Sequence, residues 1–173
     1  MLSNIKFLLP DKVRKLVYSS LILPHLFYCI NVWSHVPTNI IKQLAVIFNR
    51  TCRSILLYKQ RDVPVDQLYS QLGWLNIFQQ IKYELAIMTY KSLNNITSIN
   101  IIYPPFTHQV TNYPLRDFND FRLPINNNSY IRRSISYRSS VIWNNLPIAV
   151  KTQPNFSAFK KQLKMHLFNS SQL

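Results

Sequence analysis

The acidic side chains are the first candidates for metal-dependent chemistry, and they are few and scattered. The six acids are Asp11, Asp62, Asp66, Glu84, Asp117 and Asp120, and no two are adjacent. Holding two divalent cations about 3.5–4 Å apart for phosphoryl transfer needs carboxylates from neighbouring backbone positions. Asp11 and Asp66 each directly precede a helical pattern, so we expect them to cap helices. Asp117 and Asp120 lie among arginines, and we expect them to form salt bridges. The sequence therefore predicts no catalytic residue.

Histidine and cysteine do not predict a metal site either. His25 and Cys29 are four residues apart and share one face of a helix, but no second pair follows at the spacing of zinc ligands. The single glycine, Gly73, excludes a glycine-rich phosphate loop. We therefore expect no metal and no cofactor. Cys29 and Cys52 have no paired spacing, which indicates buried free thiols in a reducing, intracellular compartment, nuclear or cytoplasmic.

Basic side chains are the more informative group. Lysine and arginine total 20 against 6 acids, for a formal net charge of +14. Such an excess favours a polyanionic partner, nucleic acid before a membrane surface. The alternative is a soluble domain whose charge is incidental.

The first basic cluster follows the segment 38–57 and its end. It comprises Lys42, Arg50, Arg53, Lys59 and Arg61. Arg50 and Arg53 are one helical turn apart, and two guanidinium groups at that spacing can bind successive phosphates bidentately. A solvated helix face accounts for these residues equally well on the sequence alone.

Two further clusters lie later in the chain. The second comprises Arg116, Arg122, Arg132, Arg133 and Arg138, interleaved with aromatic residues. Arginine alternating with aromatics can neutralise phosphates and stack bases of a single strand. The aromatics can equally anchor a loop on the core, which we favour for Phe118 and Phe121. The third cluster is Lys160, Lys161 and Lys164, which we interpret first as the solvated face of an amphipathic helix.

Helices must position these clusters. We expect helices at about 12–33 with a break at Pro24, 38–57, 67–72, 76–94, 134–145 and 156–168. On the second of these, Thr38 or Asn39 is the expected cap, and a buried stripe is expected at Ile40, Leu44, Ile47, Thr51 and Ile55. On the helix expected at 12–33, one face is expected to carry Val13, Leu16, Val17, Ser20 and Leu21.

The fold expected from these patterns is mainly α. Residues 1–94 form a helical bundle, residues 95–133 a proline-rich connector, and residues 134–173 a two-helix tail that packs back on the bundle. Within the connector, residues 121–125 and 130–132 could pair as a small hairpin. No Asp, Glu, Lys or Arg occurs between Leu16 and Ile41, a length that could cross a bilayer. Interruption by prolines, histidines, asparagines and serines favours a buried helix pair over a membrane span.

Three blocks, read in order, carry a resemblance to a known family. They run Tyr18-Ser-Ser-Leu-Ile-Leu-Pro-His-Leu-Phe-Tyr-Cys-Ile-Asn-Val-Trp33, Trp143-Asn-Asn-Leu-Pro147 and Phe159-Lys-Lys-Gln-Leu-Lys164. This order resembles the region after the polymerase palm of non-LTR (LINE-type) retrotransposon reverse transcriptases. The matching positions are Pro24, Tyr28, Trp33, Trp143, Asn144, Leu146, Pro147 and Phe159. In the second block we expect Trp143 and Leu146 to pack, an asparagine to cap the helix end and Pro147 to stop the helix.

The resemblance implies a function. The region 1–94 would be a thumb that follows the template–primer backbone, which favours phosphate contacts for Arg50 and Arg53. The parent protein would carry out target-primed, RNA-directed DNA synthesis with Mg²⁺ held by a palm preceding Met1, and that palm would be a partner of this region. We do not expect the chain alone to polymerise. The alternatives are a helical protein-interaction or scaffold module and a membrane-associated helical protein.

Overall fold

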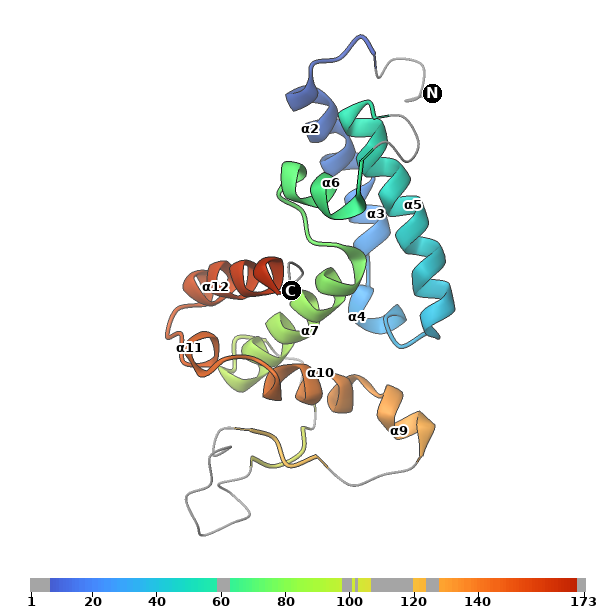
Figure 1. The fold of residues 1–173 in the computed structure, drawn as a ribbon. Coiled ribbons are helices and arrows are strands. Elements are labelled where there is room, and N and C mark those ends of the chain that lie inside the picture. The colour runs from blue at the N-terminus through green and yellow to red at the C-terminus, as the bar shows by residue number, and fades with distance from the viewer. Residues whose placement is uncertain are drawn as a thin grey trace. The chain divides into compact units, whose positions relative to one another are not determined.

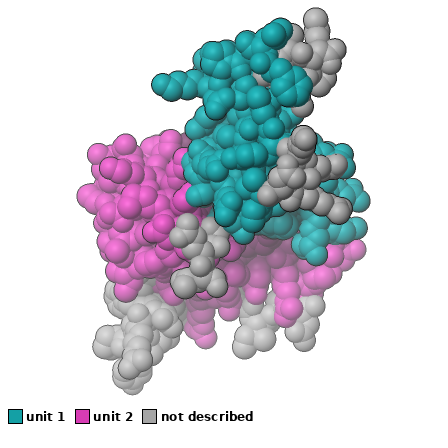
Figure 2. Space-filling model, turned by 45° about the horizontal axis from the view of Figure 1, so that its top comes forward, with its two compact units in different colours: residues 1–80 teal, residues 81–173 magenta. Residues whose placement is uncertain are grey.

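The computed structural model describes residues 7–58, 63–97, 101, 103–106, 120–123 and 128–170. Over these residues the chain is mainly α-helical, as the sequence predicts (Figure 1). It forms two compact units, residues 1–80 and 81–173 (Figure 2). The division falls inside helix α7 (Ile77–Leu93), whereas the sequence pattern placed that whole helix in the first domain.

The first unit contains a series of helices separated by backbone breaks. They are α2 (Asp11–Leu21), α3 (Leu23–Phe27), α4 (Ile30–Trp33), α5 (Thr38–Leu56) and α6 (Val65–Leu72). Pro24 lies in the first turn of α3 and Pro37 precedes α5, positions at which the missing proline N–H costs nothing. Cys29, with a φ of 51°, separates α3 from α4. Within the described residues, no helix is both long and apolar enough to cross a membrane.

The core of the first unit is centred on Phe48 of α5. Its ring stacks on Trp74 at 5.9 Å between centroids and contacts Phe27 and Tyr69 at 5.5 Å. Aromatic pairs at such separations contribute about 0.5–1.5 kcal/mol each beyond the area that they bury. Phe48 therefore joins α3, α5, α6 and the segment that follows α6.

The bounds predicted for α5 are confirmed, but its predicted buried stripe is wrong. The buried residues are Ile41, Phe48, Cys52 and Ile55, while Ile40 and Ile47 are 42% and 53% exposed. Only Ile55 of the predicted stripe is buried, and Leu44 and Thr51 are half-buried. The aromatic contacts of Phe48 turn the face that carries Ile41, Phe48 and Cys52 toward the core. The predicted side-chain cap at Thr38 or Asn39 is also wrong, because Pro37 holds the cap position.

Helix α2 differs from the expected pattern more strongly. Arg14 and Tyr18 are buried, at 3% and 7% exposure, whereas Val13, Leu16 and Leu21 are exposed. The Arg14 Nε donates to the Ile55 carbonyl oxygen at 2.7 Å, and its other nitrogens contact the Leu9 carbonyl and the Asp11 carboxylate. Burial of Arg14 is possible because its guanidinium is satisfied by these acceptors.

The two aspartates predicted as helix caps do not act as caps. Asp11 is the first residue of α2, after Pro10, and pairs with Arg14. Asp66 lies inside the first turn of α6, after the cap position Pro64. Gly73, with a φ of 63°, ends α6 as predicted, since this left-handed backbone favours glycine.

Helix α7 begins with a reciprocal cap. The Asn76 backbone N–H donates to the Gln79 side chain, and the Gln79 N–H donates to the Asn76 side chain, both at 2.9 Å. This is the geometry of a capping box, with asparagine in the place of serine or threonine. On this helix Ile77, Ile81 and Leu85 are buried, and Met88 is half-buried.

The second unit continues α7 and adds the C-terminal helices. These are α9 (Ser129–Arg133), α10 (Ile135–Asn144), α11 (Ile148–Lys151) and α12 (Phe156–Asn169). Ser134 caps α10 and Asn155 caps α12, which confirms both predicted helix starts. The Phe159 ring stacks on Tyr90 of α7 at 4.2 Å and lies 6.1 Å from Trp143. The tail is thus packed on the second half of α7.

The predicted hairpin in the connector is wrong. Tyr130, Ile131 and Arg132 are part of α9, which the Asn128 side chain caps through the Tyr130 N–H. Phe121 instead forms an antiparallel bridge with Phe106. Its ring is buried and stacks on Phe106 at 4.5 Å and on Tyr103 at 5.2 Å. Phe121 therefore anchors the connector, as predicted, while Phe118 lies outside the described residues.

Candidate nucleic-acid interface

The cations of α5 differ in what they contact. Lys42 and Arg50 are exposed. Arg53 is half-buried, and one of its terminal nitrogens donates to the Val63 carbonyl oxygen at 3.0 Å. Arg53 thus helps to hold the start of the α6 segment, and Arg50 is the more available of the two for a ligand. The remaining members of this cluster, Lys59 and Arg61, lie outside the described residues.

The exposed side of α5 is positively charged without compensation from the helix itself. The helix sequence from Thr38 to Leu56 contains no acidic residue. A phosphate approaching Lys42 and Arg50 would therefore meet no carboxylate from the same helix. A charge of this kind attracts a polyanion at a range set by the Debye length, about 8–10 Å at physiological salt.

A second basic surface lies at α9 and the start of α10. Arg132 and Arg133 are exposed, and Tyr130 beside them is 81% exposed. An exposed ring next to two guanidinium groups can stack on a base while the arginines contact the flanking phosphates. We call this set, Tyr130, Arg132 and Arg133, the α9 patch.

Arg138 of α10 is less accessible than the α9 patch. It is half-buried, and burial lowers the pKa of its guanidinium. Since arginine is effectively always protonated, this shift reflects desolvation and leaves the charge in place. Arg122 is exposed, and Arg116 lies outside the described residues. Arg132 and Arg133 therefore lie next to each other at the end of α9, and Arg138 lies on the following helix, α10, beyond the break at Ser134.

The lysines of α12 follow the amphipathic pattern. Lys161 and Lys164 are exposed, whereas Phe159, Leu163 and Leu167 of the same helix are buried. The Lys160 ammonium lies 5.4 Å from the centroid of the Phe156 ring, a cation–π distance. Lys161 and Lys164 are therefore solvated cations that can serve as a reference for the candidate surfaces.

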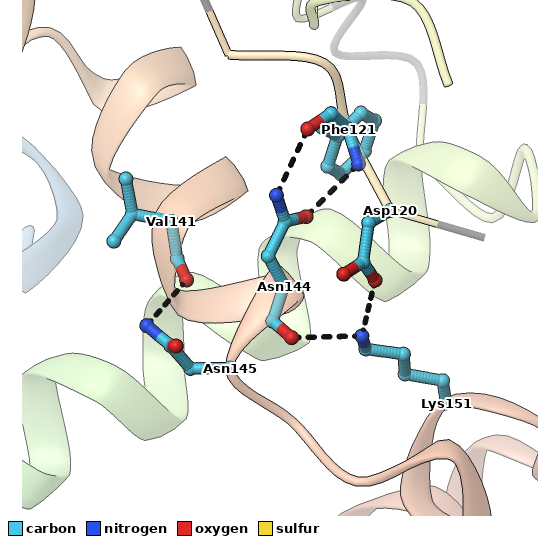
Figure 3. Close-up of polar contacts among 6 residues, drawn as sticks. All are labelled: Asp120, Phe121, Val141, Asn144, Asn145 and Lys151. Atoms are coloured by element: carbon cyan, nitrogen blue, oxygen red, sulfur yellow. Dashed lines mark hydrogen bonds and ion pairs between the residues drawn. The ribbon is translucent and has the colours of Figure 1, made fainter. Parts of the chain in front are cut away.

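The Trp143–Pro147 block has a structural role that Figure 3 makes visible. The Asn144 side chain accepts a hydrogen bond from the Phe121 N–H and donates one to the Phe121 carbonyl, both at 2.9 Å. Asn145 caps the helix end by donating to the Val141 carbonyl at 3.0 Å. Trp143 and Leu146 are buried, as predicted. The block therefore ends α10 and attaches the connector to it.

An ion pair supports the same attachment. The Lys151 ammonium lies 2.6 Å from the Asp120 carboxylate and donates to the Asn144 carbonyl at 3.0 Å (Figure 3). The sequence pattern suggested a neighbouring arginine as the partner of Asp120 and gave no sign of Lys151, which is 31 residues away. Asp117 lies outside the described residues. In the described part of the chain, no group of three or more metal-ligating side chains occurs.

The first block also has an internal contact. The Trp33 indole N–H donates to the Tyr28 carbonyl oxygen at 2.8 Å, across the break between α3 and α4. The Tyr28 ring itself is 77% exposed. Cys29 is exposed as well, so the expectation that both thiols are buried is wrong for Cys29 and confirmed for Cys52. Burial raises the Cys52 pKa from 9.0 to about 12.

Comparisons with protein-family models, with curated proteins and with solved structures found no match for this chain.

Proposed function

We propose that this chain binds nucleic acid through phosphate contacts, as the region that follows the palm of a retrotransposon reverse transcriptase. The parent activity would be RNA-directed DNA synthesis with Mg²⁺ in the palm, and the ligand of this region would be the template–primer backbone. The support for the family is the order and spacing of the three sequence blocks. The support for binding is the charge of +14.

The observation that carries the proposal is the exposure of cations on both units. Lys42 and Arg50 are exposed on α5, and Arg132 and Arg133 are exposed in the α9 patch beside the exposed ring of Tyr130. The side chains of Arg14 and Lys151, in contrast, are only 4% and 7% exposed. Each of them binds a backbone carbonyl and an aspartate within the fold. Phosphate contacts from exposed side chains of this kind would be independent of base sequence.

The two surfaces would differ in the ligand that they favour. Arginine and lysine on a helix contact the phosphates of a duplex without needing free bases. The α9 patch adds an aromatic ring, which can stack only on a base that is unpaired or at an end. We therefore expect α5 to contribute to duplex binding and the α9 patch to single-strand binding.

The proposal is tested with matched double variants that each remove two positive charges. These are Lys42→Gln/Arg50→Gln on α5, Arg132→Gln/Arg133→Gln in the α9 patch, and Lys161→Gln/Lys164→Gln on α12 as control. Fluorescence anisotropy would measure binding to a labelled RNA–DNA hybrid and to a labelled single-stranded RNA. One lost phosphate contact flattens the log–log salt slope by about 1, which is roughly a tenfold loss of affinity at 0.1 M salt.

We expect the α5 variant to weaken hybrid binding by roughly tenfold or more and the α9 variant to weaken single-strand binding at least as much. The α12 control should change the affinity for the hybrid and for the single strand by less than about threefold. Equal losses in all three variants would show that only net charge matters and would reject both surfaces. No measurable binding of the unmodified chain at low salt would reject the proposed function itself.

A further inference from the structure

Helix α5 carries an apolar stripe outside the core of its unit. It consists of Ile40, Leu44, Ile47 and Thr51, and we call it the α5 seam. Ile40 and Ile47 are 42% and 53% exposed, and Leu44 and Thr51 are half-buried. The unit's core uses the neighbouring side of the same helix, Ile41, Phe48, Cys52 and Ile55. The α5 seam is therefore a second apolar surface, additional to the one that stabilises the fold.

The spacing of the α5 seam suits a helical ligand. Its residues are separated by four, three and four positions, which is the spacing of alternating d and a positions in a heptad repeat. A helix that packs along such a row inserts its side chains between those of the row. From residue 40 to residue 51 the seam extends over about 17 Å, or three turns, so a helix of ordinary length covers it.

The charges beside the α5 seam define the ligand further. Gln43 and Arg50 occupy the g positions of the same heptad frame, on the solvent side of the seam, and both are exposed. The helix contains no acidic residue. In paired helices, the charges at these flanking positions set partner choice. An acidic flank on the ligand would complement Arg50, and a basic flank would be repelled.

We propose that the α5 seam binds an α-helix of a partner protein that presents apolar residues at heptad spacing and carries glutamate or aspartate on its flank. A second copy of this chain is a poorer ligand, because each copy carries a charge of +14 and α5 offers no acid. A lipid surface is also a poorer ligand, since an interfacial helix needs a broad apolar face. The seam is one row wide, with Gln43 and Arg50 at its edge.

A synthetic peptide provides the test on the full chain. The probe is a fluorescein-labelled 21-residue peptide (about three heptads) with leucine at a and d, glutamate at e and g, and alanine or glutamine elsewhere. Glutamate at all flanking positions disfavours self-association of the peptide. A control peptide has the same composition with the leucine positions scrambled, and a second control has lysine at e and g. The scrambled peptide keeps the charge and removes the apolar row.

Variants on α5 distinguish the contribution of the apolar seam residues to peptide binding from the contribution of charge. Ile40→Gln/Ile47→Gln should weaken binding of the acidic peptide by about tenfold or more, because both exposed isoleucines lose apolar contact. Val46→Gln is the matched control: Val46 is 48% exposed on the same helix but about 100° around it from Ile47. Arg50→Glu should reverse the preference toward the lysine-flanked peptide. Nucleic-acid binding should be unchanged in Ile40→Gln/Ile47→Gln, so this result is independent of the proposed function.

The outcomes are distinct. Preference for the patterned acidic peptide over the scrambled one, lost in Ile40→Gln/Ile47→Gln and kept in Val46→Gln, would support the inference. Equal binding of the patterned acidic peptide and the scrambled acidic peptide would show that charge alone drives the interaction. That result would overturn the inference. Dimerisation of the unmodified chain in light scattering, lost in the same double variant, would overturn it by assigning the seam to a second copy. Seam-dependent binding to anionic vesicles, with no peptide binding, would overturn it in favour of a lipid surface.

Discussion

Asn144→Asp is the substitution that tests most closely how the Trp143–Pro147 block acts. It changes one NH₂ group to oxygen and preserves the shape of the side chain. In the native protein the Asn144 amide satisfies both backbone groups of Phe121, accepting from its N–H and donating to its carbonyl at 2.9 Å. An aspartate can still accept from the N–H, but it cannot donate while it is ionised. The Phe121 carbonyl would then face a carboxylate oxygen.

The expected loss in the free energy of unfolding of Asn144→Asp follows from these two hydrogen bonds. Loss of one net hydrogen bond costs about 0.5–1.5 kcal/mol, and leaving a partly buried acceptor unsatisfied costs about 1–3 kcal/mol. Because the site is only part-buried, we expect the free energy of unfolding to fall by about 2 kcal/mol at neutral pH. The same change at the neighbouring residue, Asn145→Asp, affects one exposed contact at a helix end. It should cost no more than about 1 kcal/mol.

The pH dependence gives a second signature. When the new carboxyl of the Asn144→Asp variant is protonated, it can donate to the Phe121 carbonyl, so folding should raise its pKa above the ordinary aspartate value of about 3.9. A group whose pKa is raised on folding contributes stability below the unfolded pKa, and this contribution is lost as pH rises through the folded pKa. The stability deficit of Asn144→Asp should therefore be small near pH 4 and grow toward pH 7.

Urea unfolding followed by circular dichroism would measure these differences. Unfolding curves of the native chain, Asn144→Asp and Asn145→Asp would be compared at about pH 4 and about pH 7. Equal losses of stability in Asn144→Asp and Asn145→Asp at neutral pH would refute the structural role assigned to the Asn144 amide. A deficit of Asn144→Asp that does not depend on pH would refute the assigned hydrogen-bond directions.

The remaining predictions concern the first unit. Arg14→Met should lower the free energy of unfolding by about 2–4 kcal/mol, because it leaves the Ile55 carbonyl without its buried donor. Asp11→Asn should lower the free energy of unfolding by at most about 1 kcal/mol, because the Asp11 carboxylate is exposed. Urea titrations of both variants check this, and equal losses would contradict it. Cys29 should react with a thiol reagent in the native state and Cys52 only after unfolding, as labelling followed by mass spectrometry would show. Since the Cys52 pKa is raised from 9.0 to about 12, its contribution to stability should be lost as pH rises between those values. Reaction of Cys52 with the reagent in the folded protein at neutral pH would contradict the burial of this thiol.

Helix limits were the most predictable part of the fold, because local signals determine them. Pro37 before α5, Gly73 after α6 and Asn155 before α12 act through their own backbone or through a residue two positions away. Such signals are present in the sequence whatever the rest of the chain does. The expected starts and ends of these helices are therefore confirmed to within a residue or two.

The buried face of α5 could not be predicted in the same way. Its apolar residues cover a wide arc that includes both the α5 seam and the row Ile41, Phe48, Cys52 and Ile55. Periodicity alone does not choose between adjacent rows of similar hydropathy. The choice depends on the rings that pack on Phe48, and those come from three other segments.

Polar residues with distant partners were missed for a related reason. Arg14 contacts Ile55, 41 positions away, and Asn144 contacts Phe121, 23 positions away. A sequence pattern assigns a charged residue to the surface, because buried charges need partners that the pattern does not show. For the candidate interface, exposure of Arg50, Arg132 and Arg133 agrees with that default, while the contact of Arg53 with Val63 depends on the tertiary fold.

The measurement that tests the central claim most directly is the salt dependence of binding of the unmodified chain to nucleic acid. Dissociation constants for an RNA–DNA hybrid and a DNA duplex, each in two unrelated sequences, would be measured between low and physiological salt. If about 4–6 phosphates are neutralised, log K should fall against log salt with a slope of roughly −4 to −5. The two sequences of each duplex should give the same affinity. A flat salt dependence, or no binding at the lowest salt, would contradict the claim that this chain binds the phosphate backbone.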